Sequence, residues 1–354
     1  MKRFYVHLFL FIFPVLLFGQ EVQTRQARAF AAKLLAETRV PGLSIAVSVG
    51  DSIVWLEGFG LADVSQKIPV TRSTRFRIGS VTKLLTAAAA ARLYEQGRLD
   101  LDAPVQQYVP SFPDKGKPIT TRQLLGHTSG IRHYSRSEFF NRHRYESVSE
   151  ALTIFQNDSL LFAPGTRYGY SSYGYVLASA VIEAASGKNF LSFLKEEVIE
   201  PLSLRSIGPD YNDTLDTSQA KPYSLDSLNS WIIGPFNDNS NRWAAGGFLS
   251  TSEDLVRFGS SLQKDGFLNT DTRKLLFTSQ KTSEGKVTGV GLGWRVGKDS
   301  LGHQYFHHGG ESIGSRAYLL IYPSSNVIVA LLANLTFARF GEKEALELAK
   351  TFMK

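Results

Sequence analysis

The chain of 354 residues contains no cysteine. That absence excludes disulfide bonds, a thiol nucleophile and the lipid-bearing cysteine of a lipoprotein. The sequence also lacks a His-Glu-x-x-His segment and its histidines are scattered, so we expect no metal site and no cofactor. No repeat of about 20–50 residues is visible, which argues against a solenoid or a propeller. With 43% hydrophobic residues, the chain can bury the core of one large domain or two ordinary ones.

The N-terminus has the layout of a secretory signal peptide. Lys2 and Arg3 precede an apolar run over residues 8–18. A bilayer-spanning helix needs about 20 apolar residues, so this run is short for a permanent span. We expect a signal peptide over residues 1–20, with cleavage after Gln20 although no Ala-x-Ala site is present, and no stable membrane span afterwards. An uncleaved signal would instead be a membrane anchor. An exported chain without disulfides is typical of a bacterial periplasmic or secreted protein.

The formal net charge is +7, and the charges are mostly dispersed. The densest basic patch consists of Arg132, His133, Arg136, Arg142, His143 and Arg144. No nucleic-acid-binding motif accompanies it, so a solvated loop face is the better interpretation. We therefore expect a small-molecule or peptide substrate and no nucleic-acid partner. The oligomeric state is left open by the sequence.

Apolar periodicity and turn residues predict the secondary structure. We expect helices over 21–37, 80–95, 176–185, 190–198 and 342–352, and strands over 43–49, 52–59, 290–296, 305–308, 316–322 and 327–333. Gly50-Asp51 marks a hairpin between the first two strands, and Gly97 ends the helix that begins at Ser80. The segment Ser147-Val148-Ser149-Glu150 fits a capping box.

Strands at both ends of the chain, with helices between them, predict an α/β (α+β) fold. We expect residues 21–354 to form one domain after the signal peptide. Its antiparallel sheet would come from residues of about 21–70 and 285–354, and residues of about 71–284 would form a large helical insertion. A cleft should lie between the two parts, and Ser80 comes at the first return from strand to helix.

Ser80 and Lys83 form a Ser-x-x-Lys pair at the start of an Ala-rich helix. Residues at i and i+3 lie on one helix face, so the lysine amine can reach the serine hydroxyl. The spacing alone is weak, because it recurs at Ser192, Ser218, Ser261 and Ser283. The surroundings of Ser80 must therefore decide between a functional pair and a surface lysine of an ordinary helix.

A serine is a poor nucleophile until a base takes its proton. Gly310-Glu311-Ser312-Ile313-Gly314 matches the elbow of Ser-His-Asp hydrolases, but a strand follows it and no histidine comes after His308. Lys83 is the alternative base, provided that it is neutral. Moving a lysine pKa from about 10.4 to near 7 costs about 4–5 kcal/mol. Burial and the positive end of the helix both act in that direction.

Several segments then occur in a fixed order along the chain. They are Phe76-Arg77-Ile78-Gly79-Ser80-Val81-Thr82-Lys83, Gln96-Gly97-Arg98-Leu99-Asp100, Leu124-Leu125-Gly126-His127-Thr128-Ser129-Gly130, Tyr170-Ser171-Ser172, Ala245-Gly246-Gly247-Phe248-Leu249-Ser250-Thr251 and His308-Gly309-Gly310. Together they resemble the family of class C β-lactamases, penicillin-binding DD-peptidases and related esterases, over nearly everything after the signal. Gly130-Ile131-Arg132-His133-Tyr134 and Tyr173-Gly174-Tyr175 resemble its branch of mitochondrial serine β-lactamase-like proteins and their bacterial relatives.

The resemblance implies a β-lactamase/transpeptidase-like fold and a role for each matching residue. Ser80 would be acylated and Lys83 would take its proton. Tyr170, as a phenolate or through hydrogen bonding with Lys83, would relay the proton and later activate water. His308, rather than the adjacent His307, would orient the substrate or the Tyr170 hydroxyl.

The remaining matches line or support the substrate site. The backbone N–H groups of Ser80 and Glu311 would form the oxyanion hole, with Gly310 beside them. Ser172 would contact the substrate. His127 would be a structural residue of a buried turn.

Two positions depart from the family pattern. Ser172 stands where the β-lactamases and peptidases have asparagine, and His308 stands where the β-lactamases have lysine. Both changes weaken the expectation of β-lactam hydrolysis. The sequence therefore predicts an exported serine hydrolase acting on an amide or ester, as a peptidase, an esterase or a β-lactamase-like enzyme. The alternative is a catalytically impaired, penicillin-binding-like binding or scaffold protein.

Overall fold

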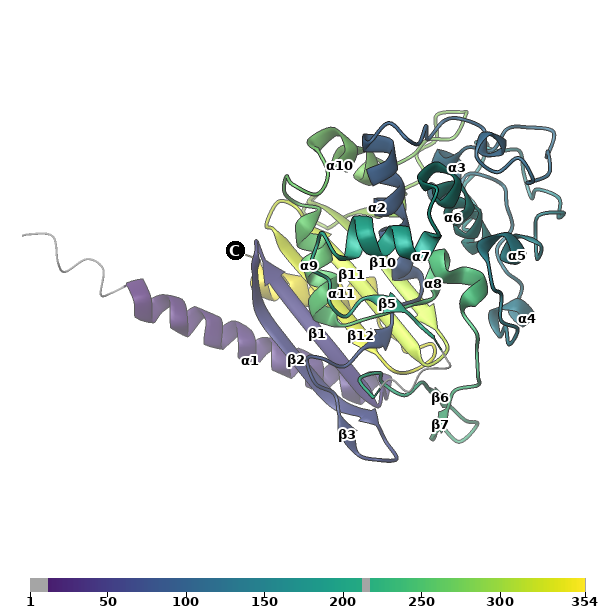
Figure 1. The fold of residues 1–354 in the computed structure, drawn as a ribbon. Helices are drawn as coiled ribbons and strands as arrows, with labels where there is room; N and C mark the ends of the chain where they lie inside the picture. Colours follow the sequence, from purple (N-terminus) through teal and green to yellow (C-terminus); the bar gives the residue numbers. More distant parts are fainter. Residues whose placement is uncertain (1–11, 212–216, 354) are drawn as a thin grey trace, which may run out of the picture.

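A seven-stranded antiparallel sheet lies at the centre of the computed structural model, which describes residues 12–211 and 217–353 (Figure 1). The strand order is β3-β2-β1-β12-β11-β10-β9, so strands from the two chain ends meet where β1 pairs with β12. The strands are β1 Gly42–Val49, β2 Ser52–Asp63, β3 Ile68–Pro69, β9 Arg295–Lys298, β10 Gln304–Ser312, β11 Ser315–Tyr322 and β12 Val327–Ala333. The expected sheet built from both termini is confirmed.

Helices cover both faces of this sheet. α1 (Ile12–Thr38) and α11 (Glu342–Phe352) pack on one face, and α9 (Ser252–Ser261) packs on the other. The alternation of β1 shows the two faces: Ile45 points toward α1 and α11, while the Ser44 hydroxyl lies 2.8 Å from the Ser252 hydroxyl of α9. The predicted helix over 342–352 and the predicted hairpin at Gly50 are confirmed.

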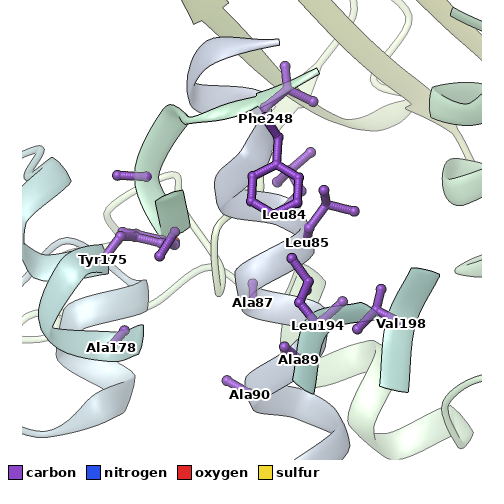
Figure 2. Close-up of a cluster of buried hydrophobic side chains, with 14 of the residues drawn as sticks. Leu84, Leu85, Ala87, Ala89, Ala90, Tyr175, Ala178, Leu194, Val198 and Phe248 are labelled. Carbon is purple, nitrogen blue, oxygen red and sulfur yellow. The ribbon is translucent and has the colours of Figure 1, made fainter. Parts of the chain in front are cut away.

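The helical part is packed around one central helix, α2 (Thr82–Glu95). Every residue from Thr82 to Ala91 is buried, and the small alanines let neighbouring elements approach the helix closely. Figure 2 shows Ala87, Ala89 and Ala90 of α2 in the same cluster as Tyr175, Ala178 and Leu194, and Phe248 beside Leu84. A helix buried on all sides has no solvent-facing side for a charged residue.

The other helices surround α2. They are α3 Thr121–Leu125, α4 Arg136–Phe139, α5 Val148–Leu152, α6 Ser172–Ser186, α7 Phe190–Leu194, α8 Trp243–Gly246 and α10 Thr270–Phe277, with single turns at η1 Gly79–Val81, η2 Val105–Gln107, η3 Lys195–Ile199 and η4 Ser240–Arg242. Two small sheets, β4 (Phe76–Arg77) with β8 (Phe248–Ser250) and β5 (Gly208–Pro209), and β6 (Tyr223–Leu225) with β7 (Trp231–Ile233), complete the fold.

Three local expectations differ from the structure. The strand expected over 290–296 begins only at Arg295, as β9, and Val290 forms a single bridge to Arg295, because the glycine-rich chain turns between them and Gly293 has φ of +83°. The helix expected over 190–198 changes after Leu194 into the wider turn η3. At α5, the Ser147 side chain caps the Glu150 N–H, but the Glu150 carboxylate accepts from Glu146 instead of completing the capping box.

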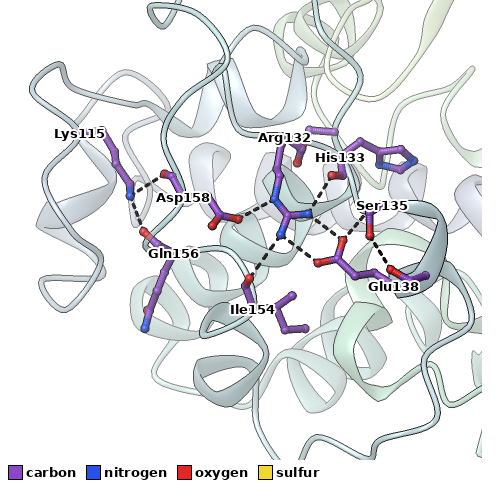
Figure 3. A network of polar contacts seen from close by, with 10 residues as sticks. Lys115, Arg132, His133, Ser135, Glu138, Ile154, Gln156 and Asp158 are labelled. Atoms are coloured by element: carbon purple, nitrogen blue, oxygen red, sulfur yellow. Dashed lines mark hydrogen bonds and ion pairs between the residues drawn. The ribbon is translucent and has the colours of Figure 1, made fainter.

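Arg142, His143 and Arg144 of the basic patch are exposed, as expected for a solvated loop face, whereas Arg132 is half-buried. The Arg132 guanidinium donates to the Glu138 carboxylate at 2.7 Å and to the Asp158 carboxylate at 2.6 Å (Figure 3). These contacts raise the pKa of Arg132 and lower the pKa of Glu138 to about 2. Arg132 thus ties the loop before α4 to the segment after α5, and it is a structural residue of this loop.

The signal-peptide prediction falls largely on residues 1–11, which lie outside the described residues. From Ile12 the chain is helical through Gln20 and on to Thr38. Within the described part of the chain, no helix has both the length and the apolar character needed to cross a membrane.

Asn334 joins three strands of the sheet and gives a test of this arrangement. Its side-chain oxygen accepts from Gly42 N at 2.7 Å, and its amide nitrogen donates to Leu61 O at 3.1 Å. Replacing Asn334 by Ala leaves these buried backbone groups without partners, so we expect a loss of about 1–3 kcal/mol in the free energy of unfolding, measured by urea denaturation. The exposed Asn157→Ala is the control, and equal stability of the two variants would contradict the assignment.

Candidate active site

Ser80 lies in a tight turn just ahead of α2. The turn spans Gly79–Val81, and Gly79 has φ of +48°, a conformation that glycine adopts readily. Ile78 N donates to Phe248 O at 2.9 Å, so β8 fixes the chain immediately before the turn. Although the regular α-helix begins only at Thr82, the i to i+3 relation between Ser80 and Lys83 is kept.

Lys83 is completely buried, and its amine contacts three oxygen atoms. Nζ lies 3.1 Å from Ser80 Oγ, 3.0 Å from Ser172 Oγ and 2.7 Å from the Ala245 carbonyl oxygen. The Ala245 carbonyl can only accept a hydrogen bond. A neutral amine can therefore donate to Ala245 O and to the Ser172 hydroxyl while its lone pair accepts from the Ser80 hydroxyl.

The surroundings of Lys83 favour this neutral form. Burial lowers the pKa of Lys83 well below the usual value, and the positive charges of Arg242 and Arg295 lower it further. Among the described residues, no carboxylate forms an ion pair with the amine. The geometry and the electrostatics both favour a lysine that accepts a proton from Ser80.

Tyr170, from the loop that precedes α6, contacts the same serine. Its hydroxyl donates to Ser80 Oγ at 2.9 Å, and its ring packs against the His127 ring with centroids 4.4 Å apart. Burial raises the pKa of Tyr170, so the phenol keeps its proton at neutral pH. The sequence left open a Tyr170 phenolate or a hydrogen bond of Tyr170 with Lys83. The structure favours a protonated phenol, and the hydroxyl bonds Ser80 Oγ.

Ser172 is the first residue of α6 and is 1% exposed. Its hydroxyl accepts from the Lys83 amine, and its backbone N–H donates to His133 Nδ1 at 3.1 Å. These contacts place Ser172 beneath the cleft, beside the amine. His127 behaves as the expected structural residue, since it has φ of +58° and its Nδ1 accepts from Ser171 N at 3.2 Å.

Two glycines let strand β10 approach the Ser80 turn. A Cβ on Gly310 would lie 2.0 Å from Ile78 O, and a Cβ on Gly79 would lie 2.7 Å from Glu311 N. Both distances are shorter than a side-chain carbon tolerates. The Ser80 turn and strand β10 are therefore in contact at Gly79 and Gly310. The backbone N–H groups of Ser80 and Glu311 come from these two neighbouring segments. The Glu311 side chain forms an ion pair with Arg316.

His308 and His307 are neighbours on β10 with different environments. His308 is 2% exposed, and its Nδ1 donates to Gly309 O at 2.6 Å, which leaves the Nε2 lone pair free to accept. Burial lowers the pKa of His308 well below its usual value, so the ring is neutral. His307 bonds the Tyr318 hydroxyl at 2.6 Å, and burial lowers its pKa to about 4.

These groups border a cleft of about 730 Å³. Its lining includes Ser80, Tyr170, His307, His308 and Glu311, together with aromatic residues from the segment before α5. In residues 12–211 and 217–353, no group of three or more histidine, aspartate or glutamate residues is arranged to hold a metal ion. The site is therefore built from a hydroxyl, an amine, a phenol and backbone donors.

Known proteins share this fold and this order of segments. A family model described as Beta-lactamase matches residues 27–351. The human mitochondrial serine beta-lactamase-like protein LACTB is 29% identical over 391 residues, which cover 84% of this chain and 71% of that protein. The chain therefore belongs to the Beta-lactamase family, whose members include serine hydrolases that act through an acyl-enzyme.

Solved structures agree with this assignment. The octameric penicillin-binding protein homologue from Pyrococcus abyssi is 27% identical, with a TM-score of 0.81 over 93% of this chain and 77% of that chain. A D-stereospecific amidohydrolase from Streptomyces sp. is also 27% identical, with a TM-score of 0.77 over 90% of this chain and 97% of that chain. The expected β-lactamase/transpeptidase-like fold is confirmed.

Two residues near the amine were not found from the sequence. Arg242 is buried after a run of buried polar residues, Asn237–Asn241, and Arg295 lies with its guanidinium 5.9 Å from the centre of the Tyr170 ring. Neither arginine lies at a sequence spacing from Lys83 that would predict a contact, because tertiary packing brings both of them toward the amine. A buried arginine ahead of the Ala245-Gly246-Gly247 segment could have been noted only from its place in that motif.

Gly310 gives a test of the contact between β10 and the Ser80 turn. We expect Gly310→Ala to displace β10, since its Cβ would overlap Ile78 O, and to slow the reaction of the protein with a fluorophosphonate at least about tenfold. The rate of labelling, followed by mass spectrometry, measures the effect. Gly309→Ala is the control, because its Cβ would meet only the Tyr318 side chain at 3.2 Å. Equal rates for both variants would contradict the close approach.

Proposed function

We propose that this chain is an exported serine hydrolase that cleaves an amide or ester bond through an acyl-enzyme on Ser80. The observation that carries the proposal is the double contact of Ser80 Oγ, with Lys83 Nζ at 3.1 Å and with the Tyr170 hydroxyl at 2.9 Å. A nucleophile, a neutral base and a proton donor within hydrogen-bond reach are what acyl transfer requires.

In acylation, Ser80 Oγ attacks the carbonyl carbon of the substrate and its proton passes to Lys83 Nζ. The negative charge that develops on the carbonyl oxygen is stabilised by the backbone N–H groups of Ser80 and Glu311. One donor of this kind typically lowers the barrier by about 3–4 kcal/mol. The close approach of Gly310 to the Ser80 turn supports this placement of Glu311 N.

Tyr170 completes the transfer to the leaving group. The bond from the carbonyl carbon to the leaving nitrogen or oxygen breaks as the phenol gives its proton to that atom and regains one from Lys83. In deacylation, a water molecule attacks the ester carbon and gives a proton to the same groups. The bond from that carbon to Ser80 Oγ then breaks, the proton passes to Ser80 Oγ, and the carboxylic acid leaves. The raised pKa of Tyr170 supports a phenol that donates and is then restored.

The residues around the catalytic groups favour an ester or peptide at least as much as a β-lactam. Ser172 is occupied by the Lys83 amine, so its hydroxyl is less available to a substrate amide than an asparagine in the cleft wall would be. The His308 ring is neutral, so it attracts a substrate carboxylate less than a lysine would. His308 Nε2 can accept a hydrogen bond from the substrate.

Export is supported by the N-terminal pattern of two basic residues followed by the apolar run over 8–18. We propose a periplasmic or secreted location in a bacterium, with an uncleaved segment as the anchored alternative. Protein sequencing of the N-terminus after expression with its native leader would show whether the chain begins after Gln20.

Ser80→Ala tests the nucleophile. We expect this substitution to abolish both fluorophosphonate labelling and turnover of p-nitrophenyl esters, because Ser80 lines the cleft and its hydroxyl contacts the Lys83 amine. Ser135→Ala is the matched control, since Ser135 also lines the cleft, and it should label normally. Labelling that persists in Ser80→Ala would refute the proposal. Labelling of the unsubstituted chain without turnover of any ester or peptide amide would favour the binding-protein alternative.

The pH profile and the Lys83→Met variant test whether Lys83 is the general base. The lowered pKa of Lys83 means that the amine is neutral above that pKa and protonated below it, so kcat/KM should fall as the pH is lowered. Lys83→Met removes the base and should reduce kcat/KM by at least about 100-fold. The exposed Lys188→Met should leave the rate and the pH profile unchanged. A rate that increases toward low pH would contradict the assignment of Lys83 as a base.

A further inference from the structure

One wall of the cleft is built from aromatic rings that remain open to water. The rings of Tyr134, Phe139, Phe140 and Phe337 line the same cavity as Ser80. Phe140 is 39% exposed and Phe337 is 59% exposed, which is unusual for phenylalanine. Contiguous exposed apolar surface of this kind in a cleft indicates a binding site.

The rings form one continuous surface. The Phe139 ring lies 5.8 Å from the Tyr134 ring, 5.3 Å from the Phe140 ring and 6.2 Å from the Phe337 ring, centroid to centroid. Phe139 and Phe337 are stacked at an interplanar angle of 21°, although they come from α4 and from the segment after β12. Two distant segments thus contribute to a single apolar wall.

The rest of the cleft lining is largely polar. It includes Arg295, the ion pair of Glu311 with Arg316, and Glu342, which accepts from the Tyr305 hydroxyl. A ligand that fills the cleft next to Ser80 must place its apolar part against the aromatic wall to gain from burial.

Arg242 holds this aromatic wall from behind. It is 5% exposed, and its Nη2 donates to Phe139 O at 2.8 Å and to Asn237 Oδ1 at 2.7 Å. Its guanidinium carbon lies 5.3 Å from the centre of the Tyr134 ring and 5.5 Å from that of Phe139. A planar guanidinium can stack on rings and donate to a carbonyl at the same time, which a lysine cannot reproduce.

The segment that carries Arg242 is tied to the same loop at two further points. Asn141 Nδ2 donates to Asp238 O at 3.1 Å, and Tyr145 N donates to Ser240 Oγ at 2.8 Å. The loop that presents Phe139 and Phe140 is therefore fastened to η4 along its length. Of these contacts, the one made by the Arg242 guanidinium involves the aromatic rings of Tyr134 and Phe139 directly.

We propose that the cleft takes substrates with an aromatic or bulky apolar group beside the scissile bond, bound against the aromatic wall, and that Arg242 is the positioning residue for this wall. The inference rests on the proposed acyl-enzyme function of Ser80 and names its class of substrate. Tyr134, Phe139, Phe140 and Phe337 are the specificity-determining residues, and Arg242 acts through them.

Thioesters with small groups test the proposal without an aromatic reporter in the substrate. S-ethyl thioacetate is compared with S-ethyl phenylthioacetate, which adds the ring on the acyl side, and with S-benzyl thioacetate, which adds it on the leaving side. Thiol release is followed with a disulfide reagent at a pH where the rate no longer changes. We expect kcat/KM for at least one ring-bearing thioester to exceed that of S-ethyl thioacetate at least about tenfold.

Substitutions in the wall should remove that preference. Phe139→Ala and Phe337→Ala should each reduce the preference at least about fivefold, mainly through a higher KM for the ring-bearing thioester. Tyr94→Ala is the matched control, because Tyr94 is 40% exposed and lies outside the cleft. It should keep the full preference.

Arg242→Met should lower the preference as Phe139→Ala does, and Arg242→Lys should restore it only in part. A merely structural role would reduce kcat/KM for all three thioesters equally and would overturn the assignment of Arg242. If Arg242→Met does not fold, the preference of Arg242→Lys for the ring-bearing thioesters tests the role of Arg242, and the two phenylalanine variants test the aromatic wall. Hydrolysis that needs Ser80 but shows no preference for either ring would overturn this inference alone, whereas hydrolysis that survives Ser80→Ala would overturn the proposed function.

Discussion

The site depends on keeping the Lys83 amine out of water without a counterion. A buried ammonium with no carboxylate partner is destabilised by several kcal/mol, whereas a neutral amine is satisfied by one carbonyl and one hydroxyl. Ala245 O and the Ser172 hydroxyl supply these acceptors, and the remaining lone pair is directed at Ser80. This arrangement requires α2 to be buried on every side, and its run of alanines makes that possible by letting α6 and α8 pack closely. The fold of the helical part is thus what makes the base available.

The second constraint is the contact between the two parts of the fold. Strand β10 of the sheet approaches the Ser80 turn closely because Gly79 and Gly310 carry no Cβ. Beyond His307, β10 has no further pairing with β9, so its outer edge faces the cleft. On its other side β10 pairs with β11, so the backbone N–H groups along the outer edge of β10 are held rigidly. The Ser80 turn beside this edge is held in turn by the hydrogen bond from Ile78 N to β8. Rigid donors stabilise developing charge without reorganising during the reaction.

The sequence was sufficient for the sheet and for the central pair of residues. Apolar runs located β1, β2, β11 and β12, because these strands are buried on at least one face. The i to i+3 relation between Ser80 and Lys83 was also predicted correctly, although a 3₁₀ turn replaces the start of the expected helix. The sequence prediction failed for most of residues 290–296, where apolar residues sit in a turn whose shape is set by packing of Gly291 against Leu276 O. The sequence did not predict that Arg242 and Arg295 act on Lys83, because a local sequence pattern does not show which distant charged residues pack near an amine. Nor could it show that Ser172 faces Lys83, because a motif position does not fix a rotamer.

Arg242 connects two properties of the site that would otherwise be independent. An arginine stays charged under all ordinary conditions, so when two cations share one buried region, the lysine is the group that loses its proton. The guanidinium is tolerated there because it lies on the rings of Tyr134 and Phe139 and donates to the Phe139 carbonyl oxygen. The same contacts that make its burial possible therefore fix the aromatic wall, and the same charge lowers the pKa of Lys83. Base strength and the shape of the cleft are coupled through one side chain, so a change that loosens the wall also changes the field at the base.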